Sequence, residues 1–408
     1  MVQPFHPPAR TLMGPGPSDV HPRILEALSR PTIGHLDPAF IGLMDEIKEL
    51  LQFAFKTQNN LTLPVSAPGS AGMETCFVNL LSPGDKVIVA QNGAFGGRMQ
   101  ENVERSGAIP IVTQDDWGNA VDLQKVEDAL RANPDARVLA FVHAETSTGA
   151  RSDAAELCQL AQAHHCLTIV DAVTSLGGIE VDVDGWGADA VYSGTQKCLS
   201  CVPGISPVTF SDRAAAVIRD RPHKAQSWFL DLNLVMGYWG KSDQRAYHHT
   251  APINGLYALH EALRILHEEG LENAWARHEL QHAALAAGLQ ILGLDFLVDS
   301  EHRLPQLNSV LIPDGLDDAR VRRDLLANHQ LEIGAGLGPL AGKVWRIGLM
   351  GSSCNQKNVL LCLNALGQVM NQHGVSVDTK LSVEAALACY KSRSGRQSTD
   401  AGTIKTAG

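Results

Sequence analysis

Two short predicted strands end in residues that could bind one small molecule. Residues 167–170 form an apolar, β-branched run that ends at Asp171, and residues 190–192 precede the polar stretch Ser193–Lys197. Because ligands bind at the carboxyl ends of strands in an open α/β sheet, we expect both ends to face one site. A lysine amine forms a Schiff base with an aldehyde, and an aspartate keeps a pyridine nitrogen protonated so that the ring accepts carbanion electrons. The pair therefore suits pyridoxal 5'-phosphate (PLP).

For an isolated pair of this kind, the alternative is a surface lysine and a helix-capping aspartate. The wider pattern favours the cofactor. The sequence Val-Asp-Ala-Val-Thr-Ser-Leu-Gly-Gly at 170–178, followed by Ser-Gly-Thr-Gln-Lys at 193–197, resembles the class V aminotransferases, which are fold-type I PLP enzymes. The resemblance is to the alanine–glyoxylate and serine–glyoxylate branch. It implies that Lys197 and Asp171 are the catalytic residues and that both bind the cofactor.

Other cofactor contacts follow from the same resemblance. A Gly/Ser turn opens a predicted helix at residues 69–71, and free N–H groups at a helix start bind phosphate well. Phe95 occupies the place of an aromatic residue that stacks on the cofactor ring. Thr146, within His-Ala-Glu-Thr-Ser-Thr-Gly at 143–149, matches a residue whose hydroxyl donates to the ring oxygen region. The implied cofactor-binding set, beside the catalytic pair, is Gly69, Ser70, Ala71, Phe95, Thr146, Gln196, Tyr247 and Thr250.

The resemblance also implies substrate and partner contacts. Arg346 matches an arginine that clamps the substrate α-carboxylate, for which a guanidinium fork is well shaped. Gly16, in the Pro/Gly-rich turn near the N-terminus, lines the substrate pocket, and His35 lies near its entrance. Tyr247 and Thr250 contact the cofactor phosphate of the partner in a homodimer, so each active site needs two chains.

Composition narrows the classes of function. The 408 residues carry a net charge of -11, which argues against binding to nucleic acid or an anionic membrane. No run is long and apolar enough for a signal peptide or a membrane span, and eight scattered cysteines fit a reducing compartment, so we expect a cytoplasmic protein. Cys198 and Cys201 form a Cys-x-x-Cys, but no second pair supplies zinc ligands, so we favour packing in a tight turn and predict no metal site.

The elements that position these residues alternate along the chain. Strands are predicted at 86–90, 137–143, 167–170, 190–192 and 203–210, and helices at 41–57 and 153–166. This order predicts a mostly parallel α/β sheet, and the resemblance implies seven strands in three layers with a smaller α+β C-terminal domain. We expect an N-terminal arm (1–20), a large PLP-binding domain (21–270), a small domain (271–373), and a C-terminal helix followed by a disordered tail from residue 391 (374–408).

Transamination from alanine or serine to glyoxylate, giving glycine and a 2-oxo acid, is the expected function. Three alternatives remain open. Ureidoglycine–glyoxylate transaminases of purine breakdown are similar, but they favour amide side chains where this chain has His35 and Tyr247. A cysteine desulfurase would need a mobile catalytic cysteine, for which Cys354 is the candidate, and a non-catalytic PLP-binding protein would need no Arg346.

Overall fold

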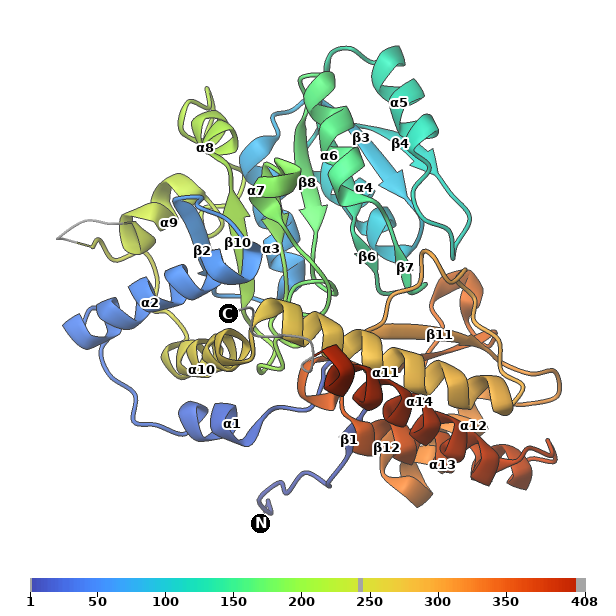
Figure 1. Cartoon of the computed structure of the whole chain (residues 1–408). Coiled ribbons are helices and arrows are strands. Elements are labelled where there is room, and N and C mark those ends of the chain that lie inside the picture. The colour runs from blue at the N-terminus through green and yellow to red at the C-terminus, as the bar shows by residue number, and fades with distance from the viewer. Residues whose placement is uncertain (1, 241–244, 401–408) are drawn as a thin grey trace, which may run out of the picture.

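The computed structural model describes residues 2–240 and 245–400, and the side chains of these residues except 393–400. A seven-stranded sheet forms the centre of the larger part (Figure 1). Its strands, in spatial order, are β2 (Leu61–Val65), β10 (Ser206–Phe210), β9 (Ala190–Tyr192), β8 (Leu167–Asp171), β5 (Ala136–Val142), β3 (Lys86–Gln91) and β4 (Ile109–Gln114). β10 runs antiparallel to the other six strands of this sheet. The prediction of a mostly parallel seven-stranded sheet is confirmed.

Helices cover both faces of this sheet, as right-handed crossovers require. The connection from β3 to β4 runs in one direction along the sheet, whereas those from β4 to β5 and from β5 to β8 run in the other, so α4 lies on the opposite face from α5 and α6. The helices of this part are α1 (Pro22–Leu28), α2 (Pro38–Phe55), α3 (Gly69–Leu80), α4 (Ala94–Arg105), α5 (Leu123–Ala132), α6 (Ala154–Ala163), α7 (Val183–Trp186), α8 (Asp212–Arg219), α9 (Leu232–Trp239) and α10 (Ile253–Glu269).

The parallel strands bring three chain segments together at one edge. Val142 pairs with Asp171, and Asp171 pairs with Tyr192, so the ends of β5, β8 and β9 are level. The residues of β8 that precede Asp171 are buried and uncharged, so Asp171 is the first ionisable group of this strand. Asp171 therefore lies at the middle of the sheet's carboxyl edge.

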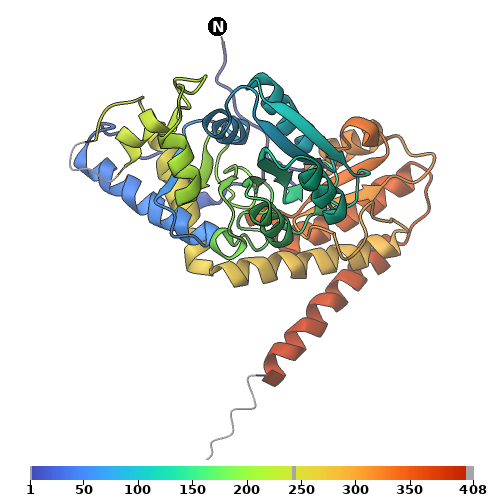
Figure 2. The same cartoon turned by 90° about the horizontal axis from the view of Figure 1, so that it is seen from above.

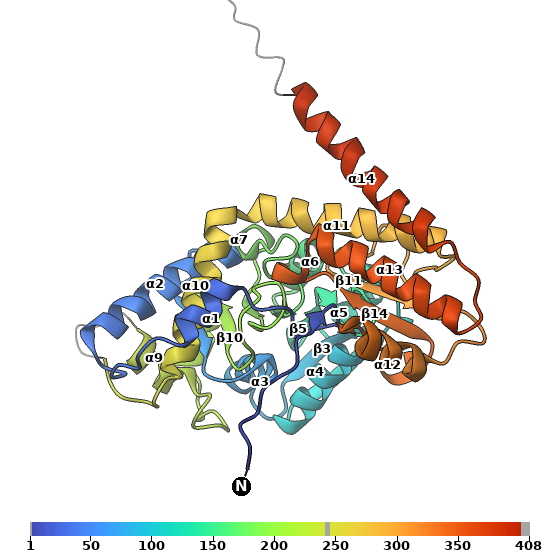
Figure 3. The same cartoon turned by 90° about the horizontal axis from the view of Figure 1, so that it is seen from below.

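The C-terminal part has its own antiparallel sheet and its own core. The sheet has the order β11 (Leu307–Leu311), β14 (Val344–Gly348) and β13 (Gly334–Ala335). It packs with α11 (Leu271–Ile291), α12 (Asp318–His329) and α13 (Gln356–Gln372) around a second hydrophobic cluster. Met13 belongs to that cluster, and β1 (Thr11–Leu12) pairs with β12 (Leu331–Glu332), so the N-terminal arm packs on this small domain (Figure 3).

The last helix, α14 (Thr379–Asp400), projects from the small domain (Figures 2 and 3). This helix continues to Asp400, past residue 390, where the sequence analysis expected the helix to end. The segment lacks apolar residues but also lacks proline, and Lys, Arg and Gln propagate a helix once it has begun. The rest of the predicted tail, residues 401–408, lies outside the described residues.

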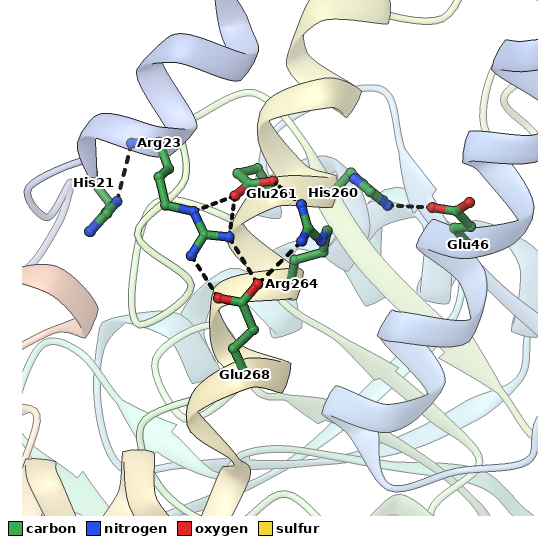
Figure 4. Close-up of polar contacts among 7 residues, drawn as sticks. All are labelled: His21, Arg23, Glu46, His260, Glu261, Arg264 and Glu268. Atoms are coloured by element: carbon green, nitrogen blue, oxygen red, sulfur yellow. Dashed lines mark hydrogen bonds and ion pairs between the residues drawn. The ribbon is translucent and has the colours of Figure 1, made fainter.

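A charge network fixes α1, which follows the arm, to α10 (Figure 4). The Arg23 guanidinium lies 2.6 Å from carboxylate oxygens of both Glu261 and Glu268, and the Arg264 guanidinium contacts the same two carboxylates. Because Glu261 is buried and contacts two arginines, this network should stabilise the packing of α1 on α10 more than a lone surface ion pair would. The start of the chain is thereby held by both the large and the small domain.

Across residues 2–240 and 245–400, no helix has the length and hydrophobicity that a membrane crossing would need.

Candidate active site

Asp171, the last residue of β8, is a buried carboxylate that no positive side chain neutralises. It is 2% exposed, and no ion pair to it occurs among the described residues. The Tyr192 hydroxyl donates to Oδ2 at 2.7 Å, and the Val173 N–H donates to Oδ1 at 2.8 Å. Burial raises the pKa of Asp171 from 3.8 to about 7. The carboxyl group is thus oriented by two neutral donors and remains available to a cation.

Lys197, in the loop after β9, is a buried amine. It is 8% exposed, and Nζ donates to the carbonyl of Pro15 in the N-terminal arm. Burial first, and the positive charge of Arg346 second, lower the pKa of Lys197 to about 8, although Asp171 and Glu145 act in the opposite direction. An amine with this pKa is a far better base near neutral pH than a free lysine.

Gly16 lies directly against the Lys197 side chain. A Cβ at this position would be 2.7 Å from Lys197 Cδ and 2.9 Å from Nζ, and the backbone has φ +102°. Both facts require glycine, because an L-residue rarely adopts that φ and its Cβ would occupy the place of the lysine. The structure therefore brings the predicted Gly16 and Lys197 together.

Arg346 and Thr146 come from distant parts of the chain and are in contact. Arg346, on β14, donates to the carbonyl of Thr146 at 3.1 Å and to the carbonyl of Ala335 at 2.7 Å. It forms no ion pair with a carboxylate within residues 2–240 and 245–400, and burial lowers its pKa to about 10. The Thr146 hydroxyl is hydrogen-bonded to that of Thr174. The guanidinium thus keeps donors for an incoming carboxylate.

Glu145, at the end of β6 (Ala144–Glu145), is a residue that the sequence analysis did not assign. It is fully buried and accepts from Ser147 N–H at 3.0 Å, from the Ser147 hydroxyl at 2.6 Å and from Phe95 N–H at 3.2 Å. Burial raises its pKa. The sequence signal that could have identified Glu145 is its place in the motif at residues 143–149. Glu145 fixes the start of α4 and hence Phe95, whose ring lies 4.6 Å from the Arg98 guanidinium.

The start of α3 presents backbone donors near the lysine loop. A Cβ at Gly69 would lie 3.5 Å from the Ser193 carbonyl, and Pro68 supplies no side-chain cap. No acceptor binds the N–H of Gly69 or Ser70 within the described part of the chain, whereas Ala71 N–H donates to the Pro68 carbonyl at 2.7 Å. The contact of Ala71 with the phosphate stays a prediction, with this bond to Pro68 as the observed state of its N–H. Gln196 Oε1, also buried, has no partner among the described groups.

Three predicted residues lie away from this group. Tyr247 is 61% exposed, and its ring lies 5.1 Å from that of His35. Thr250 is exposed as well. No contact joins these three residues to Lys197 or Asp171 in residues 2–240 and 245–400.

The Cys-x-x-Cys is part of the packed turn after Lys197. Cys198 and Cys201 are buried free thiols, and burial raises the pKa of each to about 12. Cys201 N–H donates to the Thr195 carbonyl at 3.0 Å. Neutral, buried thiols are unreactive and fit the packing interpretation.

Comparison with known proteins identifies the family. The model of the family "Aminotransferase class-V" matches residues 26–339. The chain belongs to this family. This class V aminotransferase is 38% identical over 409 residues to (S)-ureidoglycine–glyoxylate transaminase of Bacillus subtilis (strain 168), covering 96% of this chain and 97% of that one. It is 40% identical over 375 residues to alanine–glyoxylate aminotransferase of Callithrix jacchus, covering 91% and 90% of the two chains.

Solved structures agree with this assignment. Ureidoglycine–glyoxylate aminotransferase of Bacillus subtilis superposes with a TM-score of 0.93 at 39% identity, over 95% of this chain and 100% of that one. Alanine–glyoxylate aminotransferase of Nostoc sp. superposes with a TM-score of 0.89 at 45% identity, over 91% and 97%. The class V aminotransferase is therefore an enzyme with the fold-type I architecture of PLP-dependent aminotransferases. A cysteine desulfurase from Thermococcus onnurineus, at 15% identity and TM-score 0.69, shares the fold alone.

Proposed function

We propose that this class V aminotransferase uses PLP to move the amino group of alanine or serine to glyoxylate, giving glycine and a 2-oxo acid. The observation that carries the proposal is the pair Asp171 and Lys197, two buried ionisable groups without an ion-pair partner among the described residues. Burying such groups is unfavourable unless a ligand satisfies them. An aldehyde for the amine and a protonated ring nitrogen for the carboxylate would do so.

The remaining side chains fit the other parts of PLP. Gly69 and Ser70 N–H would hold the phosphate, and Gln196 would lie beside the phosphate or ring. Phe95 would stack on the ring, and the Thr146 hydroxyl would donate to the ring oxygen. When bound, the cofactor supplies the electron sink that stabilises a carbanion at the donor Cα.

The protein's own groups would then orient the donor and move its proton. Arg346 would bind the donor carboxylate through the guanidinium N–H groups that Thr146 and Ala335 leave free. Lys197 Nζ, with its pKa lowered to about 8, would take the proton from Cα. Gly16 would form the wall beside the amine, because nothing larger fits there.

The decisive experiment replaces the lysine. Lys197→Ala should abolish turnover and the lysine-linked absorbance, and borohydride reduction of the wild-type holoenzyme should attach the cofactor to the peptide that contains Lys197. Lys357→Ala, at an exposed position on α13, is the matched control and should retain both. Normal turnover by Lys197→Ala, or attachment to another peptide, would refute the proposal.

The Arg346→Ala variant distinguishes an aminotransferase from a non-catalytic PLP-binding protein. If Arg346 binds the donor carboxylate, Arg346→Ala should raise the KM of the amino donor at least tenfold while the lysine-linked absorbance stays, since loss of a charged hydrogen bond costs about 1.5–3 kcal/mol. An unchanged KM would favour a non-catalytic PLP-binding protein.

Desulfuration has little support, because Cys354 is buried and burial raises its thiol pKa.

The donor is tested directly. Relatives named above are called a ureidoglycine–glyoxylate transaminase and an alanine–glyoxylate aminotransferase, and the former covers 96% of this chain. We favour alanine or serine, because the paired rings of His35 and Tyr247 stand where ureidoglycine enzymes favour amides. A panel of alanine, serine, aspartate and freshly generated ureidoglycine, with glyoxylate as acceptor, should give the highest kcat/KM for alanine or serine. A higher value for ureidoglycine would reverse the order.

A homodimer with shared sites completes the proposal. Exposed aromatic residues, Trp228 at 63% and Tyr247 at 61%, support an interface beside Thr250. Tyr247→Ala/Thr250→Ala and Lys197→Ala should each have low activity, but mixed dimers of the two should regain it, because one site then has its lysine and the intact Tyr247 and Thr250 of the partner subunit. No recovery would place both residues in their own chain's site.

We also infer a cytoplasmic enzyme, as the free cysteines and the net charge suggest.

A further inference from the structure

Ser18 in the N-terminal arm is bonded to the turn that carries Lys197. This serine is 2% exposed, so its polar atoms must find partners within the protein. Its N–H donates to the Gln196 carbonyl at 3.0 Å, and its hydroxyl donates to the Lys197 carbonyl at 2.8 Å. One residue of the arm therefore holds two consecutive carbonyls at the base of the lysine.

Ser200 supplies a second hydroxyl behind the first. Its Oγ lies 3.3 Å from Ser18 Oγ and accepts from the Ser352 N–H at 2.6 Å. A serine hydroxyl has one proton, and that of Ser18 is used on the Lys197 carbonyl. The Ser200 hydroxyl therefore donates to Ser18 Oγ. The bonds run in one direction, from Ser352 N–H through Ser200 and Ser18 to the carbonyl of Lys197.

The backbone around Ser200 is shaped for this contact. Ser200 has φ +53°, which non-glycine residues rarely adopt because Cβ crowds the backbone. A side chain on Gly351 would overlap the Ser200 hydroxyl, and Gly351 also has a positive φ of +51°. The Ser200 N–H donates to the Lys197 carbonyl at 3.0 Å, so this carbonyl accepts two bonds. A strained serine is retained where glycine would fit the backbone better.

The chain of hydroxyls begins in the small domain. Ser352 belongs to the short helix η2 (Gly351–Ser353), which follows β14, the strand that carries Arg346. The next residue of the arm makes a parallel link, because Asp19 N–H donates to the Ser353 hydroxyl at 2.8 Å. A cavity of about 260 Å³, lined in part by Ser200 and Ser352, lies beside these bonds. The position of the small domain is therefore connected to the lysine turn.

We propose that Ser18 and Ser200 are positioning residues for Lys197, whose hydroxyls tie the lysine backbone to the small-domain turn that follows the Arg346 strand. This inference rests on the proposed function of Lys197. With both hydroxyls in place, the amine is held among Arg346 on β14, Asp171 on β8, Glu145 on β6 and the Cys198 thiol. Cutting the chain of bonds lets the lysine turn relax toward solvent, so the amine behaves more like a free lysine.

The test compares Ser18→Ala, Ser200→Gly and the double variant with Ser29→Ala. Ser200→Gly removes the hydroxyl but suits the positive φ, so it tests the inference even where Ser18→Ala does not fold. Ser29 lies at the exposed end of α1, and within the described part of the chain its hydroxyl bonds only to the Glu26 carbonyl. In cofactor-free protein, the rate of reductive methylation of Lys197, followed by peptide mass spectrometry across pH, gives the apparent pKa of the amine.

Each single variant should raise that apparent pKa by about one unit toward the ordinary ~10.4. The double variant should match either single variant, because both cut the same chain of bonds, and Ser29→Ala should match wild type. In the loaded enzyme, kcat should fall about tenfold in each variant, since catalysis is sensitive to small misplacements. An unchanged apparent pKa in Ser200→Gly, or additive effects in the double variant, would overturn the inference. Attachment of PLP to another lysine would refute the proposed function, yet leave the methylation result intact.

Discussion

The buried amine of Lys197 should make the cofactor-free protein less stable at neutral pH than a variant without it. Lys197→Met keeps most of the side-chain volume and removes the charge. The folded-state pKa is lowered from 10.5 to about 8. This difference of about 2.5 pKa units corresponds to about 3 kcal/mol, at about 1.36 kcal/mol per unit. The lysine therefore opposes folding by about 3 kcal/mol below about pH 8, where the amine is protonated in both the folded and the unfolded state.

The pH dependence isolates this effect. Between pH 8 and 10.5, the unfolded chain binds a proton that the folded amine has lost, so the stability of wild type rises with pH across this window. Below pH 8 the whole penalty applies. Removal of this penalty should favour Lys197→Met by about 3 kcal/mol at pH 7 and by about 1 kcal/mol at pH 10. Loss of the bond to Pro15 subtracts about 1 kcal/mol at both values, so the net advantage should be about 2 kcal/mol at pH 7 and close to zero at pH 10.

Urea unfolding of cofactor-free protein at equal protein concentration measures both free energies. Lys357→Met, at an exposed position, is the control and should show no pH-dependent advantage. If Lys197→Met has the same advantage at pH 7 and pH 10, the amine is not held in an environment that lowers its pKa. Lys197 would then be no better a base near neutral pH than a free lysine.

Two further replacements test the same site. Asp171→Asn should stabilise the cofactor-free protein by up to about 4 kcal/mol at pH 8 and not at pH 4. Burial raises the folded pKa of Asp171 from 3.8 to about 7, so the ionised carboxylate costs stability as pH rises through this range. Urea unfolding at the two pH values measures the gain, and equal gains at both would contradict a raised pKa. Gly16→Ala should destabilise the protein by more than about 1 kcal/mol and weaken cofactor retention, since its Cβ would meet Lys197 at a positive φ; full lysine-linked absorbance after dialysis would contradict this.

The local pattern of the sequence predicted the strands well, because their signal is local. The buried run 167–170 and its polar end are visible without any tertiary information, and β9 coincides with the predicted strand. The family resemblance, rather than periodicity, supplied the number of strands. The continuation of α14 to Asp400 was missed because composition predicts whether a segment can pack, and not whether a helix already begun will stop.

Contacts between distant segments could not be predicted from pattern. The amine of Lys197 meets the carbonyl of Pro15, which lies 182 residues away in sequence. The Tyr192 hydroxyl on Asp171 depends on the pairing of β8 with β9. A backbone carbonyl has no residue type to recognise, and tyrosine in a strand is ordinarily read as packing. The engagement of Ala71 N–H likewise depends on the turn at Pro68, which composition leaves open.

The candidate site contains two buried ionisable groups that have no ion-pair partner among the described residues. Burial shifts the pKa of Asp171 upward and that of Lys197 downward, and each shift favours the neutral form. A ligand that offered a cation to the carboxylate and a covalent partner to the amine would restore what burial removes. The stability that permits this must come from elsewhere, as from the buried sheet and the carboxylates shared by Arg23. Binding energy at this site therefore has a definite source, the relief of two unpaired buried groups, and a ligand that satisfies only one of them should bind less tightly.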